Sequence, residues 1–399
     1  MAVMLNQLLL RIQSKYELTC ITGTTGMTLN VNWVYYMEDV STLDFIRGGE
    51  IVITTGMHCR EEKWILDLIE QAVKYKATAV IINVGQYIKG VSEEAIAFAK
   101  QKGIPVFVMP WKMHIVDLTQ DICNFILLEK QKEFDVKKVF SSFFFKDTCF
   151  DEQLLAEHGI SGKEKYCILK GEMKQERKTG RKNLPEEKRE KEQQLERIIA
   201  DCIGELCQWN VPVCEEECIF VYLELKDISK NNEETIKSIK QKLERKGCQH
   251  EIQWGIGNIK TTFAEIEDAK EEAKKAFFVG IMQEKKVVTY AESGVYRILL
   301  EVENQKVLKE IYREKLGVLE DFPEEEKNMY LETLRNYIEC NGSIQKIAER
   351  SYVHRNTVNY RMKKLKEILP VSLEDEQEKF MIWLSFFIAD IIEGRKKLT

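Results

Sequence analysis

The sequence predicts a multidomain protein in which an α/β domain, an α+β domain and an all-α domain follow one another. Three observations indicate this order. Apolar strands alternate with helices over residues 1–130, the two mix again over 166–294, and the pattern is helical alone over 295–399. Residues 131–165 are predicted to form a helical linker. A chain of 399 residues has room for roughly two to four domains of ordinary size.

The composition is that of an ordinary globular protein. Hydrophobic residues make up 44% and charged residues 31%, and the net charge is −6. An acidic chain binds nucleic acid only if its positive charge is concentrated locally. The eleven cysteines are odd in number and irregularly spaced, which predicts free thiols in a reducing cytoplasm. We expect no secretory signal, because the N-terminus has neither a positive n-region nor a small-residue cleavage site. We expect no membrane-spanning helix, because no apolar stretch reaches the required ~20 residues.

The first domain is predicted to contain a parallel sheet covered by helices. Residues 50–56, 77–85 and 104–110 are apolar, β-branched runs, and helical patterns at 61–75 and 92–103 separate them. This β-α-β-α-β order, with strands that are apolar throughout, is typical of parallel sheets buried on both faces.

Ligands of parallel α/β sheets bind beyond the carboxyl ends of the strands. The candidate ligand-binding residues at these ends are Thr54, Thr55, Gly56, Asn83, Gly85 and Trp111. Their amides and hydroxyls suit a small polar metabolite. The alternative interpretation is ordinary turn chemistry without a ligand.

The central region is predicted to be a separate α+β domain. Its expected strands are 166–170, 217–225, 252–258 and 286–290. Its expected helices are 195–209, 234–247 and 263–280. Neither a nucleotide-binding loop nor a metal-binding spacing of His and Cys is found, so we expect no metal and no cofactor.

A helix-turn-helix is predicted at about residues 330–370. Asn341 and Gly342 form a helix stop, Ser343 suits the N-cap of a short second helix, and a longer third helix begins near His354. At 100° per residue, Val358, Met362 and Leu365 of that third helix form its buried stripe.

The other faces of this third helix carry the candidate DNA-binding residues. Together with Ser343 they are His354, Arg355, Asn356, Thr357, Asn359, Tyr360, Arg361, Lys363 and Lys364. Residues 330–370 hold eight basic and four acidic residues, so the positive charge is local within an acidic chain. A basic helix of this kind enters the ~12 Å major groove, where amides read base edges and lysines neutralise phosphates. The alternative is a basic amphipathic helix in a bundle.

The string VHRNTVNYRMKKLKEIL, residues 353–369, resembles the C-terminal helix-turn-helix of the PucR/CdaR-type bacterial transcriptional regulators. Residues 31–56, 79–85 and 97–110 are similar to the N-terminal domain of that family. Residues 254–300 are similar to its central domain, which looks like a degenerate diguanylate-cyclase fold. The resemblance implies regulation of purine catabolism, sugar-diacid use or a related pathway. Many members carry a basic residue where this chain has Asn359, which implies a different operator.

We therefore expect a cytoplasmic transcriptional regulator that binds double-stranded DNA as a homodimer or higher homo-oligomer and responds to an unknown small-molecule effector. Two alternatives stay open. One is a nucleotide-dependent cyclase or hydrolase whose C-terminal helices only dimerise, and the other is a metabolite-sensing scaffold that does not bind DNA. Cyclase chemistry needs glycines in a metal-binding hairpin. The candidate hairpin, residues 213–220, has three glutamates and no glycine, so we expect no enzyme activity.

Overall fold

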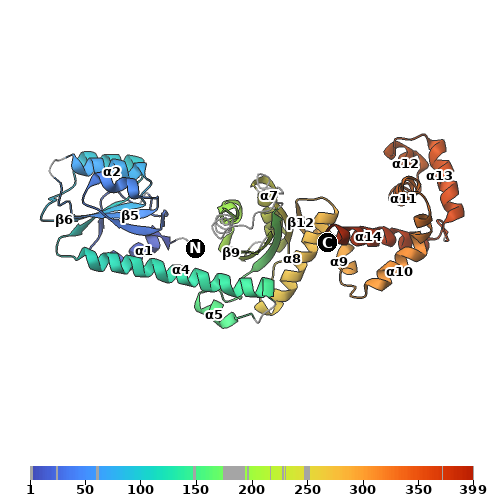
Figure 1. Cartoon of the computed structure of the whole chain (residues 1–399), viewed down its shortest axis with the longest axis horizontal. Helices are drawn as coiled ribbons and strands as arrows, with labels where there is room; N and C mark the ends of the chain where they lie inside the picture. The colour runs from blue at the N-terminus through green and yellow to red at the C-terminus, as the bar shows by residue number, and fades with distance from the viewer. Residues whose placement is uncertain are drawn as a thin grey trace, which may run out of the picture. The chain divides into compact units, whose positions relative to one another are not determined.

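The computed structural model describes residues 3–23, 26–59, 63–146, 150–173, 194–195, 197–215, 217–226, 229, 231–246, 252–370 and 372–398. The chain divides into two compact units, Met1–Lys138 and Val139–Thr399, and Figure 1 labels many of their elements. In the described ranges no helix is both long enough and apolar enough to cross a membrane.

A five-stranded sheet in the order β2-β7-β6-β5-β4 forms the centre of the N-terminal unit. The strands are β2 (Thr19–Cys20), β4 (Trp33–Tyr36), β5 (Glu50–Thr54), β6 (Ala79–Val84) and β7 (Val106–Pro110). Strands β4 to β7 are parallel and β2 is antiparallel, so the predicted parallel sheet is confirmed. The sequence did not indicate β2 and β4, because they are short and partly exposed. A small ladder pairs β1 (Val3–Met4) with β3 (Asn30–Val31).

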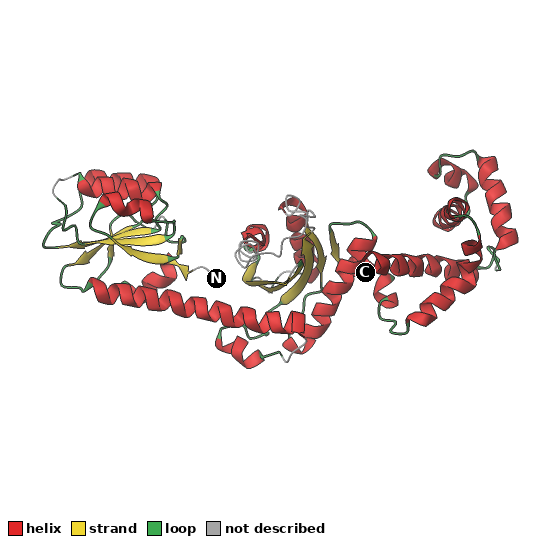
Figure 2. Ribbon diagram, viewed as in Figure 1, coloured by secondary structure: helices red, strands yellow, loops and turns green. Residues whose placement is uncertain are grey.

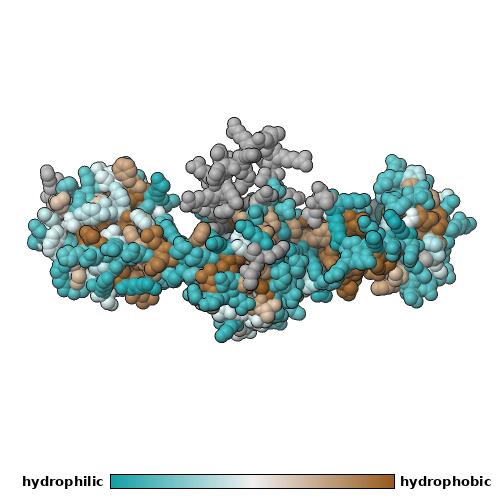
Figure 3. All heavy atoms as spheres, turned by 60° about the horizontal axis from the view of Figure 1, so that its bottom comes forward, coloured by the Kyte–Doolittle hydropathy of each residue, from teal (hydrophilic) through white to brown (hydrophobic). Residues whose placement is uncertain are grey.

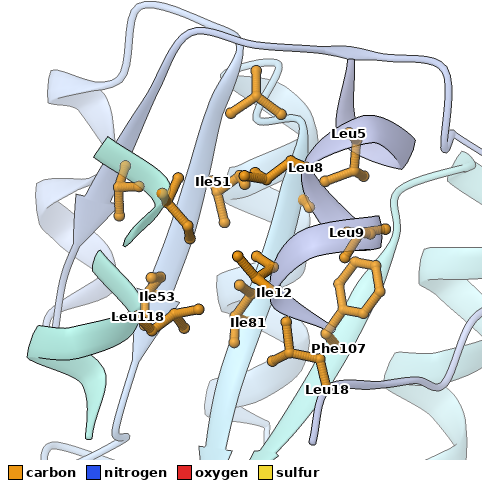
Figure 4. Close-up of a cluster of buried hydrophobic side chains, with 14 of the residues drawn as sticks. Leu5, Leu8, Leu9, Ile12, Leu18, Ile51, Ile53, Ile81, Phe107 and Leu118 are labelled. Atoms are coloured by element: carbon orange, nitrogen blue, oxygen red, sulfur yellow. The ribbon is translucent and has the colours of Figure 1, made fainter. Parts of the chain in front are cut away.

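Helices cover both faces of this sheet. They are α1 (Leu5–Ile12), α2 (Trp64–Lys74), α3 (Glu93–Lys102) and α4 (Ile115–Lys146). Successive strand residues point to opposite faces, so Ile51 and Ile53 pack with α1 and α4, as Figure 4 shows, while Val52 packs with α2. Each such buried side chain contributes about 1.5–3 kcal/mol. Helix α4 continues to Lys146 and so takes up part of the predicted linker.

The second unit begins with another five-stranded sheet, in the order β12-β11-β8-β10-β9. Its strands are β8 (Tyr166–Met173), β9 (Cys207–Glu215), β10 (Cys218–Leu225), β11 (Ile252–Ile256) and β12 (Val287–Thr289). Only the β11–β12 pair is parallel among these neighbours. Helices α5 (Glu152–Glu157), α7 (Asn232–Lys246) and α8 (Ile266–Met282) complete an α+β arrangement, as predicted.

One predicted helix of this region is too long. Residues 197–203 are helical, but the chain turns at Gly204 and Cys207 already begins β9 instead of continuing the helix to 209. The reason is tertiary. The backbone of β9 pairs with β10 as far as Cys207, and the Cys207 side chain is buried in the core below the sheet. The hairpin predicted near 213–220 is present between β9 and β10, with Glu216 outside the described residues.

From α9 onward the described chain is helical, as Figure 2 shows. The helices are α9 (Tyr296–Leu299), α10 (Gln305–Leu316), α11 (Glu324–Glu339), α12 (Ile344–Arg350), α13 (Arg355–Ile368) and α14 (Glu376–Leu398). Helix α14 joins two cores. Its Ile382 and Phe386 pack with α11 to α13, and its Ile388 and Ile391 pack with the end of α8 and with α9. On the face drawn in Figure 3, hydrophilic side chains predominate over scattered apolar patches.

Candidate nucleic-acid interface

Helices α11, α12 and α13 form the predicted helix-turn-helix. Helix α11 ends where Asn341 and Gly342 adopt positive φ angles of 49° and 74°. The Gly342 N–H donates to the Tyr337 carbonyl at 2.8 Å, which is the bond that closes a helix end of this kind. Glycine is needed here because a side chain is strained at this φ.

A hydrogen bond from α11 holds the turn between α12 and α13. The amide of Asn336, which is buried on α11, donates to the Ser351 hydroxyl at 3.0 Å. Directly after it, Tyr352 takes a φ of 51° and its side chain is 96% exposed. Ser343 occupies the N-cap position of α12 as predicted, but its side chain makes no capping hydrogen bond.

Helix α13 packs through the stripe that the sequence predicts. Val358, Met362 and Leu365 are buried and lie in one core with residues of α11, α12 and α14. This packing fixes the rotation of α13 about its own axis, so it also decides which residues face solvent.

The predicted DNA-binding residues of α13 lie on its solvent-facing surface. Those that are exposed are His354, Arg355, Asn356, Thr357, Asn359, Tyr360, Lys363 and Lys364. Arg361 is half-buried, in keeping with its predicted place near the buried edge, and Ser343 is half-buried too.

His354 is the N-cap of α13, where its Nδ1 accepts the Asn356 N–H at 3.3 Å. A neutral imidazole that accepts through Nδ1 carries its proton on Nε2. The cap therefore leaves the Nε2–H of an exposed side chain available as a donor at the start of the helix.

Most of the positive charge of α13 is not used within the unit. Four of its basic side chains form no ion pair with any described residue of the unit: Arg355, Arg361, Lys363 and Lys364. Lys366 differs, because it pairs with Glu374 at 3.0 Å. Unpaired surface cations beside exposed amides are the combination that meets phosphates and base edges in a major groove.

The sequence did not single out Tyr352, although the structure places it at the exposed turn before α13. A large aromatic residue inside a predicted turn was the available signal. A phenol here offers both a stacking face and a hydroxyl donor.

The polar groups of the candidate ligand-binding residues Thr54, Thr55 and Asn83 form hydrogen bonds within the protein. The Glu38 carboxylate accepts from the Thr55 N–H at 2.9 Å, the Thr55 hydroxyl at 2.5 Å and the Thr54 hydroxyl at 3.3 Å. It also accepts from the Met57 N–H at 2.8 Å and the Tyr36 hydroxyl at 2.6 Å. Partial burial alone would raise the pKa of Glu38, but the hydrogen bonds from Thr55, Tyr36 and Met57 outweigh it and lower that pKa. The sequence analysis missed Glu38.

The remaining candidates lie at the ends of β6 and β7. Asn83 is buried and its amide donates to the Pro110 carbonyl at 3.2 Å. Gly85 lies against Trp111, because a Cβ at Gly85 would come within 2.3 Å of the Trp111 Cβ. Trp111 is 40% exposed and packs edge-on against Tyr87. These contacts place an aromatic pair at the same sheet edge as Glu38.

Comparison with known families gives two matches. Residues 9–126 match the model of the purine catabolism regulatory protein-like family, PucR. Residues 330–388 match the model of the PucR C-terminal helix-turn-helix domain. The chain therefore contains a PucR-type N-terminal domain and a PucR-type C-terminal helix-turn-helix domain. The first match covers the sheet with the Glu38 contacts, and the second covers α11 from residue 330 onward together with α12 and α13 and their exposed basic face.

Curated proteins similar to this chain come from Bacillus subtilis (strain 168). The proline-responsive transcriptional activator PutR is 30% identical over 34% of the chain and 33% of its own length. The purine catabolism regulatory protein is 32% identical over 35% and 27%. The DNA-binding transcriptional activator AdeR is 27% identical over 25% and 24%. The matches thus span about a third or less of each relative.

Among solved structures, a regulator of polyketide synthase expression from Bifidobacterium adolescentis aligns with 67% of the chain and 94% of its own length. Its identity is 15% and its TM-score is 0.29, which is too low to define a common fold.

Within the described residues, no three His, Cys, Asp or Glu side chains gather as they would around a metal ion.

Proposed function

We propose that this protein is a cytoplasmic PucR-type transcriptional regulator that binds double-stranded DNA through α13. The observation that carries the proposal is the exposed face of α13, where three exposed basic side chains without ion pairs among the described residues lie on the same helix surface as Asn356 and Tyr360. The curated relatives named as transcriptional activators or regulators support it.

The residues have distinct roles in this proposal. Asn356 and Tyr360 face the base edges, because the buried stripe turns them toward the groove. Lys363 and Lys364 neutralise phosphates, and His354 donates its Nε2–H to a phosphate near the helix start. Tyr352 is an additional contact, since its side chain is fully outside the core.

We infer that the protein acts as a homodimer and answers to a small metabolite bound by the N-terminal unit. Two-fold symmetry lets two recognition helices meet half-sites ~34 Å apart. A proline-responsive relative and a purine-catabolism relative support small-molecule control. We also propose that the chain has domain boundaries near residues 130, 165 and 294.

The central sheet is proposed to have a degenerate cyclase-like fold without catalytic activity. Its candidate hairpin between β9 and β10 contains no glycine, and glycines let a backbone approach a nucleotide. Incubation with GTP and magnesium tests this directly. Turnover that is lost on substitution of Glu217 would favour the enzyme.

The decisive experiment measures binding of the full chain to DNA from upstream of its own gene and to random DNA of equal length. Fluorescence anisotropy at several salt concentrations is the readout. We expect tighter binding to the upstream fragment and a linear fall of log K with log salt concentration. The absence of any salt-sensitive binding would refute the proposal and favour the scaffold.

A further inference from the structure

A cluster of hydrogen-bond donors at the carboxyl end of β5 holds a carboxylate of the protein itself. Five donors converge on the two oxygens of Glu38. They are the N–H groups of Thr55 and Met57 and the hydroxyls of Tyr36, Thr54 and Thr55, with donor–acceptor distances of 2.5–3.3 Å. We call these five donor groups the carboxylate nest.

Neutral groups supply the recognition in the carboxylate nest. Hydrogen bonds from Thr55, Tyr36 and Met57 are the main causes that lower the pKa of Glu38. The negative charge is held by oriented N–H and O–H dipoles, with the turn at Gly56 in the left-handed region at φ 69°. Such an arrangement binds a planar carboxylate at a fixed place, with or without a covalent tether.

Glu38 is suited to leave this nest. It lies in the segment between β4 and the 3-10 helix Val40–Phe45, it is half-buried, and Tyr36 and Met57 around it are about half exposed. The hydrogen bonds of its carboxylate go to residues at the ends of β4 and β5.

An apolar recognition element lies on the same sheet edge. Strands β5, β6 and β7 are parallel neighbours, so their carboxyl ends follow one another at about 4.8 Å per strand. The exposed Tyr87–Trp111 pair follows β6 and β7. The turn after β5 and the loop after β6 are in direct contact, because a Cβ on Gly56 would collide with the Ile88 side chain.

We propose that the carboxylate nest is the effector site, that Glu38 occupies it when no effector is bound, and that the effector is a small organic acid. Its carboxylate replaces that of Glu38, and its apolar or planar body lies toward Tyr87 and Trp111. Exchange frees the segment that carries Glu38 and changes the contact between the turn at Gly56 and Ile88. The effector role rests on the proposed function, whereas carboxylate binding does not.

The test uses the full-length Glu38→Ala variant, which empties the nest, and acetate as the probe. Thermal unfolding is followed with sodium acetate, with sodium chloride at equal ionic strength, and with acetamide as the uncharged isostere. We expect a lower Tm for the variant, and a rise in Tm with acetate alone, since a ligand that binds only the folded state stabilises it. The wild type should need at least tenfold more acetate for the same rise in Tm, because the tethered Glu38 carboxylate competes with acetate for the donors.

The matched control is Asp39→Ala, which removes the next carboxylate along the chain. The Asp39 carboxylate lies outside the nest and accepts the N–H and the hydroxyl of Ser41. Its response to acetate should equal that of the wild type. Equal responses of Glu38→Ala and wild type, or no response of either, would overturn the proposal. Should Glu38→Ala not fold even in acetate, Glu38→Asp replaces it, and acetate must then raise its Tm more than that of the wild type.

A second measurement separates this proposal from the proposed function. The affinity of Glu38→Ala for the upstream DNA fragment is determined with acetate and with acetamide. A threefold or larger difference supports the effector role, and equal affinities refute that role. Loss of all DNA binding by the wild type refutes the proposed function while leaving the thermal result intact.

Discussion

At the scale of single residues, Asn356 and Lys364 lie on the same exposed surface of α13 but offer different chemistry. An amide forms paired hydrogen bonds with one base edge, whereas an ammonium group attracts any phosphate. The two substitutions are therefore expected to separate specificity from affinity.

Asn356→Ala should weaken binding to the specific fragment by ~1–3 kcal/mol and relax the preference at one base pair. Binding to random DNA should stay nearly the same, because phosphate contacts are kept. Anisotropy titrations with a set of single-base variants measure both quantities. An equal loss on specific and random DNA would show that Asn356 does not face the bases.

Lys364→Ala should weaken binding to every sequence alike and lower the salt slope by about one. Lys366→Ala is the matched control on the same helix, because Lys366 already pairs with Glu374. Its effect on the salt slope should be smaller. If the two variants behave identically, the distinction between free and paired cations on α13 is wrong.

The pH dependence of the N-terminal unit should report on Glu38. Hydrogen bonds lower the pKa of Glu38 below its ordinary value in the folded state. A lowered pKa means that the carboxylate contributes stability in full above the ordinary, unfolded-state pKa, and that this contribution is lost as the pH falls through the folded-state pKa. Unfolding of wild type and Glu38→Gln, measured from neutral to acid pH, should therefore differ most at neutral pH and converge in acid.

At the scale of elements, the position of α13 depends on the turn that precedes it. The buried Asn336 amide on α11 donates a hydrogen bond to the Ser351 hydroxyl in this turn, so Asn336→Ala removes that hydrogen bond. We expect a loss of about 1–3 kcal/mol in the free energy of unfolding and a larger loss for specific than for random DNA. Denaturant titration and anisotropy measure these effects. Asn328→Ala, on the exposed side of α11, is the control and should change neither.

At the scale of the whole molecule, the proposed dimer predicts a helical-phase rule for its operator. Two recognition helices related by two-fold symmetry must meet the same side of the duplex. Insertion of about 5 bp, half a turn, between the half-sites should abolish tight binding, and insertion of about 10 bp should restore much of it. Binding that ignores the spacing would mean that the protein binds each half-site independently. Light scattering of the free protein gives its oligomeric state.

The periodicity of the sequence identified those elements whose burial is continuous. Strands β5, β6 and β7 and the stripe of Val358, Met362 and Leu365 were predicted because nearly all of their core-facing positions are apolar. The short edge strands β2 and β4 were not, because two to four partly exposed residues carry too little pattern.

Hydrophobic periodicity and local charge are properties of neighbouring residues, so they are enough to predict a parallel α/β domain and a basic helix-turn-helix. Three features become visible in the folded chain alone: Cys207 belongs to a strand, Asn336 supports the turn before α13, and Glu38 accepts the donors at the end of β5. Each of these depends on groups distant along the chain or on the exact backbone path between strands, and pairing of that kind leaves no periodic trace in a sequence.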